Sequence, residues 1–493
     1  MHKKLFHVTG SLLLALIIVT NIQAQPSAPV ADDFLPKDYL TKDFHAGRRD
    51  AARQMMPENS VMVVFAYPTR TFSNDVEYLY HQNPDMYYFS GYKEPHSVLL
   101  IFKDEQKDSL GNTYKEMLFV QKRNAQAEQW TGRRLGTEGA KEKLGIPMSF
   151  NGEDFANMNI EFSKFDKIIF DRFPDDVPNG FGKADLHDLI EQFKEKSKMP
   201  EKPGSDKRFD NRLYRDLTAQ LREIKTPEEM SLIRKAVEIS CRGQNEVMKT
   251  VHPDMSELEI QGLHEYVHKR YGAEEVGYGS IVGAGENGCI LHYMENTKTK
   301  VGTSMILMDV GAEYHGYTAD VTRTVPVDGK FSDEERTIYQ LVYDAQEAAF
   351  KTLKDGSTWS DASKAAQDII ADGLLKLGII KNRADVRKYY PHGLGHHIGL
   401  DVHDRGSYQK LKKDMVITIE PGIYIPEGSD CDKKWWSIAV RIEDDALITE
   451  NGYELLSHFA PRKIEDIEKM IAEKSVLDNY KLPPLESGKK KGF

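Results

Sequence analysis

The chain has 493 residues, of which 40% are hydrophobic and 29% are charged, a composition that excludes collagen-like, low-complexity and disordered proteins. Acidic residues outnumber basic residues by 77 to 66, a formal net charge of -11, whereas a nucleic-acid-binding protein normally carries a basic surface. The three cysteines (Cys241, Cys289 and Cys431) form no CxxC pair for zinc and no disulfide framework. We therefore expect a globular protein of two or three domains that binds no nucleic acid.

The first 24 residues have the pattern of a secretory signal peptide. A basic start at Met1–Lys4 is followed by an apolar run at Ser11–Thr20 and by the small residue Ala24. The alternative, an uncleaved anchor, is disfavoured because the run is shorter than the ~20 residues of a membrane span. The sequence predicts export to the periplasm or the exterior, cleavage after Ala24, and no stable membrane insertion of the mature chain.

Residues 39–212 alternate short apolar runs with charged helical stretches. Four runs are expected to be strands because they are short, apolar and rich in β-branched and aromatic residues: Val61–Phe65, Ser97–Phe102, Met117–Val120 and Lys167–Phe170. Helical patterns such as Asp185–Lys196 lie between some of them. The pattern predicts a first α/β domain.

A second α/β domain is expected at residues 224–471. Thr226 is followed by Pro227 and Glu229, a capping box that predicts a long helix through Met248. The same capping signal recurs at two further helix starts, Ser256–Glu259 and Ser332–Glu335. Strands are expected at Met305–Val310, Ala319–Val325, Met415–Ile419 and Ile438–Ile442. Residues 472–493 are expected to form a solvated tail.

Two apolar strands of the second domain end on a carboxylate, Asp309 or Glu420, and each is followed by a strand that carries another, Asp320 or Glu443. Either a duplicated half-domain or chance explains the repeat. An ionised carboxylate in a segment suited to a sheet interior is costly unless it is paired or bound to metal. Singly, each acid could be a turn residue or a salt-bridged one. Together with histidines they favour a site for Mn²⁺, Zn²⁺ or Fe²⁺, in which two ions hold a water or hydroxide nucleophile.

Histidines form the second chemical signal. The glycine-rich segment His392–His403 holds four histidines in twelve residues, and its glycines allow a ligand to approach the backbone. It is not an HExxH motif, so a thermolysin-like zinc site is not supported. His292 lies in another short apolar segment, where a lone histidine is usually structural. Together the histidines could supply one metal ligand, proton-transfer groups and an oxyanion-stabilising group.

The segment Gly283–Gly288 is a literal GxGxxG. It follows only a short apolar stretch and opens no helical pattern, but continues into Cys289–His292. A dinucleotide site requires a strand, a turn and a helix in that order, so we do not expect one here.

The second domain resembles the M24 metallopeptidases of the pita-bread fold and, within them, the Xaa-Pro aminopeptidases (aminopeptidase P). The matching segments are Ile281–Tyr293, Asp309, Gly316–Asp320, His392–His396, Gly399–His403, Glu420–Gly422 and Arg441–Glu443. The first domain adds two more, Pro84–Gly91 and Glu128–Gly136. The resemblance covers nearly the whole mature chain. It implies an α/β fold with an N-terminal creatinase/aminopeptidase P-type domain and a C-terminal pita-bread catalytic domain.

The resemblance implies that two divalent ions are bound by the following five ligands: Asp309, Asp320, His396, Glu420 and Glu443. Asp320 and Glu443 would bridge the ions, Asp309 would complete the shell of one, and His396 with Glu420 that of the other. Mn²⁺ is the expected ion, with Zn²⁺ and Fe²⁺ as alternatives.

Further roles follow from the same resemblance. His292 and His403 would orient the scissile carbonyl and stabilise the oxyanion, and His392 would line the pocket for the proline ring. Arg441 would sit behind the metals and pair with ligating carboxylates. These four residues are the expected catalytic groups.

Asp75 and Trp130 match first-domain positions that, in the family, reach a neighbouring subunit's active site. They are therefore expected to contact the substrate, and Asp75 could receive its amino group. The resemblance thus implies a homo-oligomer, either a dimer or a tetramer.

The sequence predicts an exopeptidase that releases the N-terminal residue from peptides with proline in second position, with a metal-bridging hydroxide as the nucleophile. Proline has no amide hydrogen and restricts the preceding residue, so such an enzyme has to select it by shape. Three alternatives are a prolidase, which cleaves Xaa-Pro dipeptides with the same ligands, a metal-free binding module, which the complete ligand set disfavours, and creatinase-like chemistry, whose branch lacks these ligands.

Overall fold

The structure is a computed structural model that describes residues 38–108, 110–179, 182–202, 204–479 and 482. The expected signal peptide and residues 483–493 of the expected tail lie outside these residues. Within the described part of the chain, no helix is both long enough and apolar enough to cross a membrane.

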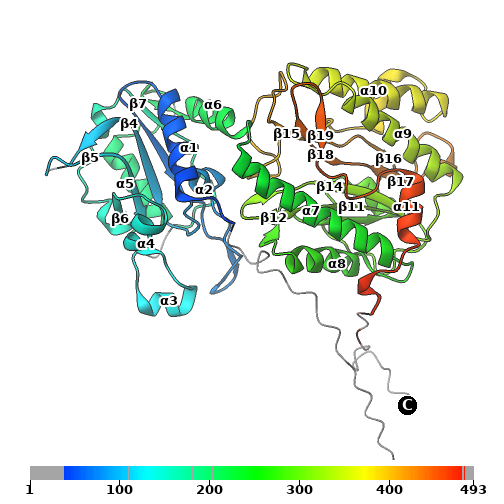
Figure 1. The fold of residues 1–493 in the computed structure, drawn as a ribbon, viewed down its shortest axis with the longest axis horizontal. Helices are drawn as coiled ribbons and strands as arrows, with labels where there is room; N and C mark the ends of the chain where they lie inside the picture. Colours follow the sequence, from blue (N-terminus) through cyan, green and yellow to red (C-terminus); the bar gives the residue numbers. More distant parts are fainter. Residues whose placement is uncertain (1–37, 109, 180–181, 203, 480–481, 483–493) are drawn as a thin grey trace, which may run out of the picture. The chain divides into compact units, whose positions relative to one another are not determined.

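The N-terminal domain contains a six-stranded sheet and a small two-stranded one (Figure 1). Its strands are β1 (Ser60–Phe65), β2 (Thr71–Ser73), β3 (Val76–Glu77), β4 (Val98–Lys107), β5 (Thr113–Val120), β6 (Ser149–Asn151), β7 (Lys167–Phe170) and β8 (Phe209–Asp210). Its helices are α1 (Lys42–Met55), α2 (Pro84–Ser90), α3 (Ala125–Thr131), α4 (Gly136–Lys143), α5 (Leu186–Ser197) and α6 (Asn211–Arg222), with 3₁₀ turns at Gly152–Asp154 and Phe162–Lys164. The main sheet has the order β6-β5-β4-β1-β7-β8.

The four strands expected in this domain are confirmed as β1, β4, β5 and β7. The strands β4 and β5 extend beyond the expected runs, because they continue past the core as a ribbon that is largely exposed. Polar residues form this extension, so apolar patterning does not reveal it. The expected helix is α5, and Asp185 is its N-cap, accepting a hydrogen bond from the backbone N–H of Asp188.

The C-terminal domain contains the second group of elements. Its helices are α7 (Pro227–Thr250), α8 (Glu257–Arg270), α9 (Asp333–Phe350), α10 (Trp359–Lys376) and α11 (Ile464–Ile471), and its 3₁₀ helices are η4 (Gly285–Cys289), η5 (Arg383–Lys388), η6 (Lys433–Trp435) and η7 (Val476–Asn479). Its strands are β9 (Glu275–Val276), β10 (Ile281–Ala284), β11 (Met305–Val310), β12 (Ala312–Tyr314), β13 (Tyr317–Thr318), β14 (Val321–Pro326), β15 (Val416–Ile419), β16 (Gly422–Ile425), β17 (Ile438–Arg441), β18 (Asp444–Ile448) and β19 (Tyr453–Leu455).

The four strands expected here form as β11, β14, β15 and β17, with ends that differ by one or two residues at most. Thr226 and Ser332 complete the expected capping boxes of α7 and α9. Ser256 caps α8 by accepting a hydrogen bond from the backbone N–H of Glu259, but between these two described residues the expected return bond to the Glu259 side chain does not form, so this third box is incomplete. The expected tail begins later than residue 472, because Leu477 is buried and Ser475 donates a hydrogen bond to Glu246 of α7.

The domain repeats one arrangement twice. In Figure 1, the pair α7 and α8 precedes β10–β14 along the chain, and the pair α9 and α10 precedes β15–β18. Gln244 of α7 donates hydrogen bonds to carbonyl oxygens of both β11 and β14, at 3.0 and 2.8 Å. Gln346 of α9 donates in the same way to the carbonyl oxygens of Ile419 and Ile442, at 2.9 and 3.0 Å. The repeat in the sequence therefore corresponds to two similarly built halves.

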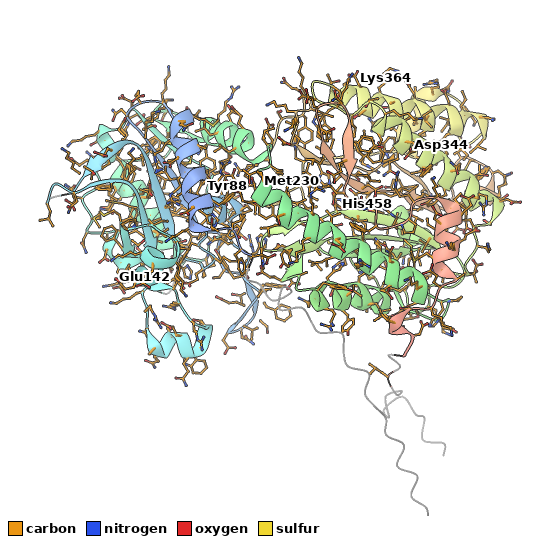
Figure 2. The ribbon with its side chains drawn as sticks, in the orientation of Figure 1. Tyr88, Glu142, Met230, Asp344, Lys364 and His458 are labelled. Carbon is orange, nitrogen blue, oxygen red and sulfur yellow. The ribbon has the colours of Figure 1, made fainter. Side chains whose placement is uncertain are left out.

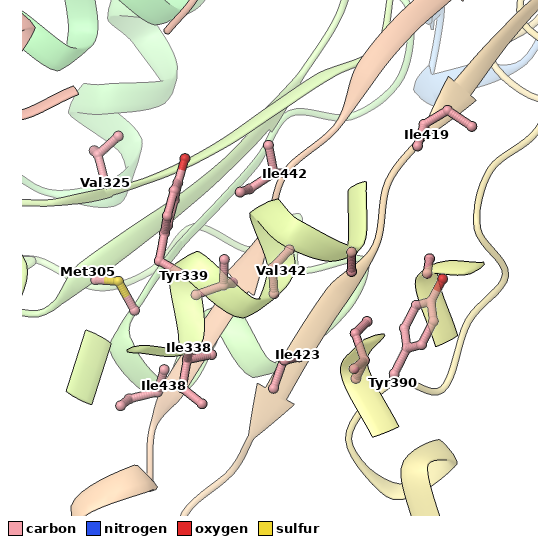
Figure 3. Close-up of a cluster of buried hydrophobic side chains, with 14 of the residues drawn as sticks. Met305, Val325, Ile338, Tyr339, Val342, Tyr390, Ile419, Ile423, Ile438 and Ile442 are labelled. Carbon is pink, nitrogen blue, oxygen red and sulfur yellow. The ribbon is translucent and has the colours of Figure 1, made fainter. Parts of the chain in front are cut away.

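Apolar side chains from the two halves pack together in one buried cluster. Figure 3 shows Met305 and Val325 of the first half in this cluster with Ile338, Tyr339 and Ile442 of the second half. A separate buried cluster contains Tyr88 of α2 and Met230 of α7, both labelled in Figure 2, and so joins the N-terminal domain to the C-terminal one.

The GxGxxG segment spans the end of β10 and most of η4, and it opens no α-helix. A Cβ on Gly283 would lie 2.8 Å from the backbone nitrogen of Gly288. The glycine therefore lets the segment fold back on itself, which is a structural use rather than a phosphate-binding one.

Candidate active site

A cavity of about 290 Å³ opens in the C-terminal domain. Its lining contains every residue for which the sequence predicts a metal or catalytic role in that domain, and the full lining is Tyr278, Gly279, Ile281, Leu291, His292, Met294, Asp309, Asp320, His392, His396, Val402, His403, Glu420, Arg441 and Glu443. The fold thus brings together residues that are up to 151 positions apart in the chain, from His292 to Glu443.

The carboxylates reach the cavity from the ends of paired strands. Asp309 lies on β11, and Asp320 immediately precedes β14. The strands β11 and β14 pair antiparallel. Glu420 follows β15, and Glu443 precedes β18, again an antiparallel partner. Each half of the domain therefore supplies two acids, as the sequence repeat suggested.

His396 comes from an irregular segment that is held against β15. Its backbone N–H donates to the side-chain oxygen of Thr418 at 3.0 Å, and its carbonyl accepts from the N–H of Thr418 at 2.9 Å. Its ring nitrogen Nδ1 lies 3.0 Å from the carbonyl of His397, which leaves Nε2 facing the acids.

The acids gather around this nitrogen. His396 Nε2 lies 3.5 Å from Asp320 Oδ2, 3.7 Å from Glu420 Oε1 and 4.0 Å from Glu443 Oε1. One ligand atom each from Asp320, His396 and Glu443 lies within 4.8 Å of the others. Glu443 Oε1 is buried and has no hydrogen-bond partner among the described residues. An orphaned carboxylate oxygen in a buried set of carboxylates and one imidazole fits divalent cations.

Two side chains outside the predicted set contact the acids of the cavity. The hydroxyl of Tyr278 lies 2.5 Å from Asp309 Oδ1 and 2.6 Å from Asp320 Oδ1. The hydroxyl of Thr322 donates to Glu443 Oε2 at 2.6 Å. Thr322 lies two residues after Asp320, so strand alternation could have placed it on the same face. Tyr278 belongs to none of the motifs, and only the fold identifies it.

Arg441 contacts one of the acids of the cavity. Its Nη2 donates to Asp309 Oδ2 at 2.5 Å and its Nη1 to the hydroxyl of Tyr424 at 2.9 Å. The hydroxyl of Tyr424 also lies 2.8 Å from His392 Nε2. Arg441 and His392 are thus linked through a tyrosine that the sequence analysis missed.

Asp445 is another buried acid that the sequence analysis missed. Its Oδ2 accepts a hydrogen bond from the backbone N–H of Asp320 at 3.1 Å, while its Oδ1 has no partner among the described residues. It therefore supports the strand end that carries Asp320.

The pKa shifts of the acids indicate that the cluster carries more negative charge than the protein neutralises. Burial raises the pKa of Asp309 and of Glu443 above the ordinary range, and raises that of Glu420 to about 7. Burial is the largest single influence on Asp320 and would raise its pKa, but the hydrogen bond and charge of His396, together with hydrogen bonds from Tyr278 and Glu443, outweigh it and lower the pKa. Burial alone would lower the pKa of His396, but Asp320 and Glu420 raise it to about 9. Bound cations would relieve this repulsion.

The other histidines lie at the cavity with different surroundings. His292 and His403 are exposed, and the His403 ring packs edge-on against His396 with 4.3 Å between the ring centroids. Burial and His396 lower the pKa of His403, so its ring is neutral at pH 7. Burial lowers the pKa of His392 to about 4, with the same result.

Asp75 and Trp130 do not line the cavity. Asp75 lies between β2 and β3 at an exposed hairpin, and Trp130 lies on α3 with 84% of its surface exposed. The predicted substrate contacts of these two residues stay predictions.

Comparisons with known proteins identify both domains. Residues 231–450 match the model of metallopeptidase family M24, and residues 45–167 match that of the aminopeptidase P N-terminal domain.

Named relatives cover almost the same length. The chain is 35% identical to the Xaa-Pro aminopeptidase of Escherichia coli over 439 residues, which covers 86% of this chain and 96% of that protein. It is 35% identical to the Xaa-Pro aminopeptidase of Haemophilus influenzae over 451 residues, or 89% of this chain and 98% of the relative. The structure of aminopeptidase P from Escherichia coli with the inhibitor Pro-Leu superimposes with a TM-score of 0.77 at 32% identity, covering 88% of this chain and 98% of that one.

Proposed function

The chain belongs to metallopeptidase family M24, with the domain order of the Xaa-Pro aminopeptidases, and we propose that it releases the N-terminal residue from peptides with proline in second position. The observation that carries this function is the convergence of four carboxylates and His396 with three further histidines in one cavity. Acids alone occur at many surfaces, but an acid cluster ringed by imidazoles combines a cation site with groups that can contact a carbonyl.

The residues Asp309, Asp320, His396, Glu420 and Glu443 would hold two divalent cations, with Asp320 and Glu443 shared between them. When bound, such cations activate the attacking water and polarise the scissile carbonyl. Mn²⁺ is the proposed ion, because oxygen ligands dominate a set with a single imidazole.

The remaining residues bind and orient the peptide. His292 and His403, exposed at the cavity, donate N–H groups to the carbonyl oxygen as negative charge develops on it. His392, neutral and held by Tyr424, forms a wall for the proline ring. Arg441 keeps Asp309 in place and balances part of the negative charge of the site.

The exposed first-domain residues are proposed to serve a neighbouring subunit. Phe72, Tyr78 and Leu79 expose more than half of their surface on the segment that carries Asp75. Apolar groups gathered on one segment favour a protein interface. A homo-oligomer, a dimer or a tetramer, would place Asp75 and Trp130 beside the peptide amino group of a second site. Light scattering of the wild type and of Trp130→Ser, with activity measured on each fraction, tests this role.

Export is proposed from the N-terminal sequence alone. The basic start and the apolar run precede the first domain, and Ala24 supplies the cleavage point. N-terminal sequencing of protein recovered from a periplasmic extract tests this proposal, with Gln25 expected as the first residue.

The decisive assay compares the tripeptide Ala-Pro-Phe with the dipeptide Ala-Pro. Metal-stripped protein is assayed with Mn²⁺, with Zn²⁺ and with no added metal. We expect alanine to be released from the tripeptide only when metal is added, with Mn²⁺ the better activator. Cleavage of the dipeptide alone would assign the protein as a prolidase. Inactivity on both peptides, in protein shown to bind metal, would overturn the proposed substrate class.

A further inference from the structure

The loop of residues 399–405 carries His403 and contains no helix or strand. Its start is held by the N–H of Thr318, which donates to the carbonyl of Gly399 at 2.8 Å. His403 itself is exposed, and apart from its ring contact with His396 its position depends on how the loop backbone is held. Its neighbours Asp401 and Asp404 determine it, because both of their side chains accept hydrogen bonds from one arginine.

That arginine, Arg222, ends helix α6 and lies outside the catalytic domain. Its Nη2 donates to Asp401 Oδ2 at 3.0 Å and also to Asp404 Oδ1. Its Nη1 donates to Asp85 Oδ1 at 2.9 Å, and Asp85 belongs to helix α2 of the N-terminal domain. The side chain of Arg222 is 2% exposed, and those of Asp85 and Asp404 are 1% exposed. One buried guanidinium therefore connects the histidine loop to the N-terminal domain.

Further contacts make this cluster specific. Lys225 Nζ donates to Asp404 Oδ2 at 2.8 Å, and the hydroxyl of Tyr214 donates to Asp85 Oδ2 at 2.9 Å. Burial alone would raise the pKa of Asp404, but Arg222 and Lys225 outweigh it and lower the pKa. Asp404 is therefore ionised, and both of its oxygens are occupied.

The backbone of the loop passes so close to this charge cluster that Gly399 leaves no room for a side chain. A Cβ on Gly399 would lie 2.2 Å from Asp404 Oδ2 and 2.5 Å from Lys225 Nζ. No side chain fits there while the charges are paired. The loop conformation and the buried charges therefore depend on each other.

We propose that Arg222 is a positioning residue for His403, and that the N-terminal domain takes part in catalysis within its own chain through Asp85. Asp401 and Asp404 flank His403 on both sides, so the guanidinium that binds both of them sets where the imidazole stands. This role rests on the proposed contact of His403 with the scissile carbonyl.

The primary variant is Arg222→Met, which keeps the length of the side chain and removes its donors. We expect kcat to fall about 10- to 100-fold, the loss typical of a misplaced catalytic group. KM and the bound metal content should stay unchanged, because Arg222 contacts no metal ligand. The matched control is Arg49→Met, which breaks a buried arginine–glutamate pair (Arg49 to Glu116, 3.1 Å) inside the N-terminal domain. The control should lose stability and keep kcat.

A double-mutant cycle separates positioning from general damage. In a His403→Ala background, Arg222→Met should change kcat by less than about 2-fold, because the group that it positions is gone. Equal losses in both backgrounds, loss of metal, or an unchanged kcat in the single variant would each overturn the proposal.

Asp85→Asn provides a second variant that preserves volume, in case Arg222→Met does not fold. Like Arg222→Met, this variant should lower kcat in the wild-type background but not in the His403→Ala background. If His403→Ala alone leaves kcat unchanged, the assigned role of His403 fails. If His403→Ala lowers kcat but the Arg222 and Asp85 effects are additive with it, only the positioning role fails.

Discussion

The two loops that carry the exposed histidines of the cavity, His292 and His403, are anchored in different ways. The His292 loop is held from within the catalytic domain by one buried carboxylate, that of Glu257. The His403 loop is held by a buried group of charges that extends into the N-terminal domain, with Arg222 at its centre.

The carboxylate of Glu257, at the start of α8, accepts hydrogen bonds from four residues of the segment around His292. Its Oε1 accepts from the N–H of Ala284 at 2.8 Å and from the side-chain amide of Asn287 at 3.0 Å. Its Oε2 accepts from the hydroxyl of Tyr293 at 2.9 Å and from the N–H of Lys298 at 2.8 Å. Tyr293 adjoins His292, so this carboxylate fixes the histidine from the next residue.

The difference shows what each histidine depends on. An anchor made within one domain forms as that domain folds. An anchor shared with a second domain forms only when both are in place. His292 should therefore respond to changes in α8, and His403 to changes at the contact between the domains.

The substitution with the largest expected effect removes activity but leaves the contacts of Glu257 and of Arg222 intact. Glu443→Gln removes a carboxylate that is proposed to be shared by both metal ions, so activity should fall to the background rate and the content of bound metal should drop. Neither loop is held through Glu443, and hydrogen exchange of residues 284–298 and 399–405 should stay as in the wild type. Loss of protection in either loop would show that the metal site, not the anchors, holds them.

Glu257→Gln tests the anchor of His292. An amide replaces one acceptor oxygen with a donor and leaves buried N–H groups unpaired, at a cost of about 2–3 kcal/mol of unfolding free energy. Activity should fall about 10- to 100-fold because His292 moves. The matched control is Glu259→Gln, an exposed glutamate two residues along the same helix. Equal losses in both variants would contradict the anchoring role, as would a loss of exchange protection in the His403 loop.

Lowering the pH should destabilise the segment around His292 before the loop that carries His403. His264 and His268 of α8 are buried, and three of their four ring nitrogens lack a hydrogen-bond partner among the described residues. Burial lowers the pKa of His268 to about 4. Its unfolded pKa is about 6.5, so the unfolded chain binds a proton that the folded chain does not as pH falls from about 6.5 to about 4. Stability is therefore lost across that window.

The expected loss from His268 is about 3 kcal/mol. Urea unfolding at pH 7 and pH 4.5 measures it, with His268→Leu as the comparison that should flatten the pH dependence. A variant as acid-sensitive as the wild type would show that other groups govern the effect. Exchange in the His292 loop should rise with acid before that in the His403 loop.

The smallest expected effect concerns salt. Buried charges are screened far less than surface ones, so raising the salt concentration should leave kcat of the wild type within about 2-fold. A steady fall of kcat with salt in the wild type, absent from Arg222→Met, would mean that the Arg222 cluster is open to solvent ions. Steady-state assays at several salt concentrations with the same tripeptide measure this.

Local patterning in the sequence located eight strands and the helices α5, α7, α8 and α9, but not the buried strands β10, β16 and β18. Thr226 and Ser332 marked two helix starts because a capping box is a local hydrogen-bond pattern. The extended ends of β4 and β5 were not predicted because they consist of exposed polar residues. Such residues show no alternation of apolar and polar side chains from which a strand could be recognised.

The motifs of the chain were enough to identify the family, the domain order and nine residues with an expected metal or catalytic role, all of which line the cavity. Asp309, Glu420 and their neighbours stand in motifs whose residue types and spacing are local properties. Only the tertiary structure showed that Tyr278 bridges two acids and that Arg222 binds both neighbours of His403. Arg222 and Asp404 are 182 residues apart, and such a pair has no local signature. Their contact exists because the packing of two domains removes both charges from water, which makes the pairing obligatory.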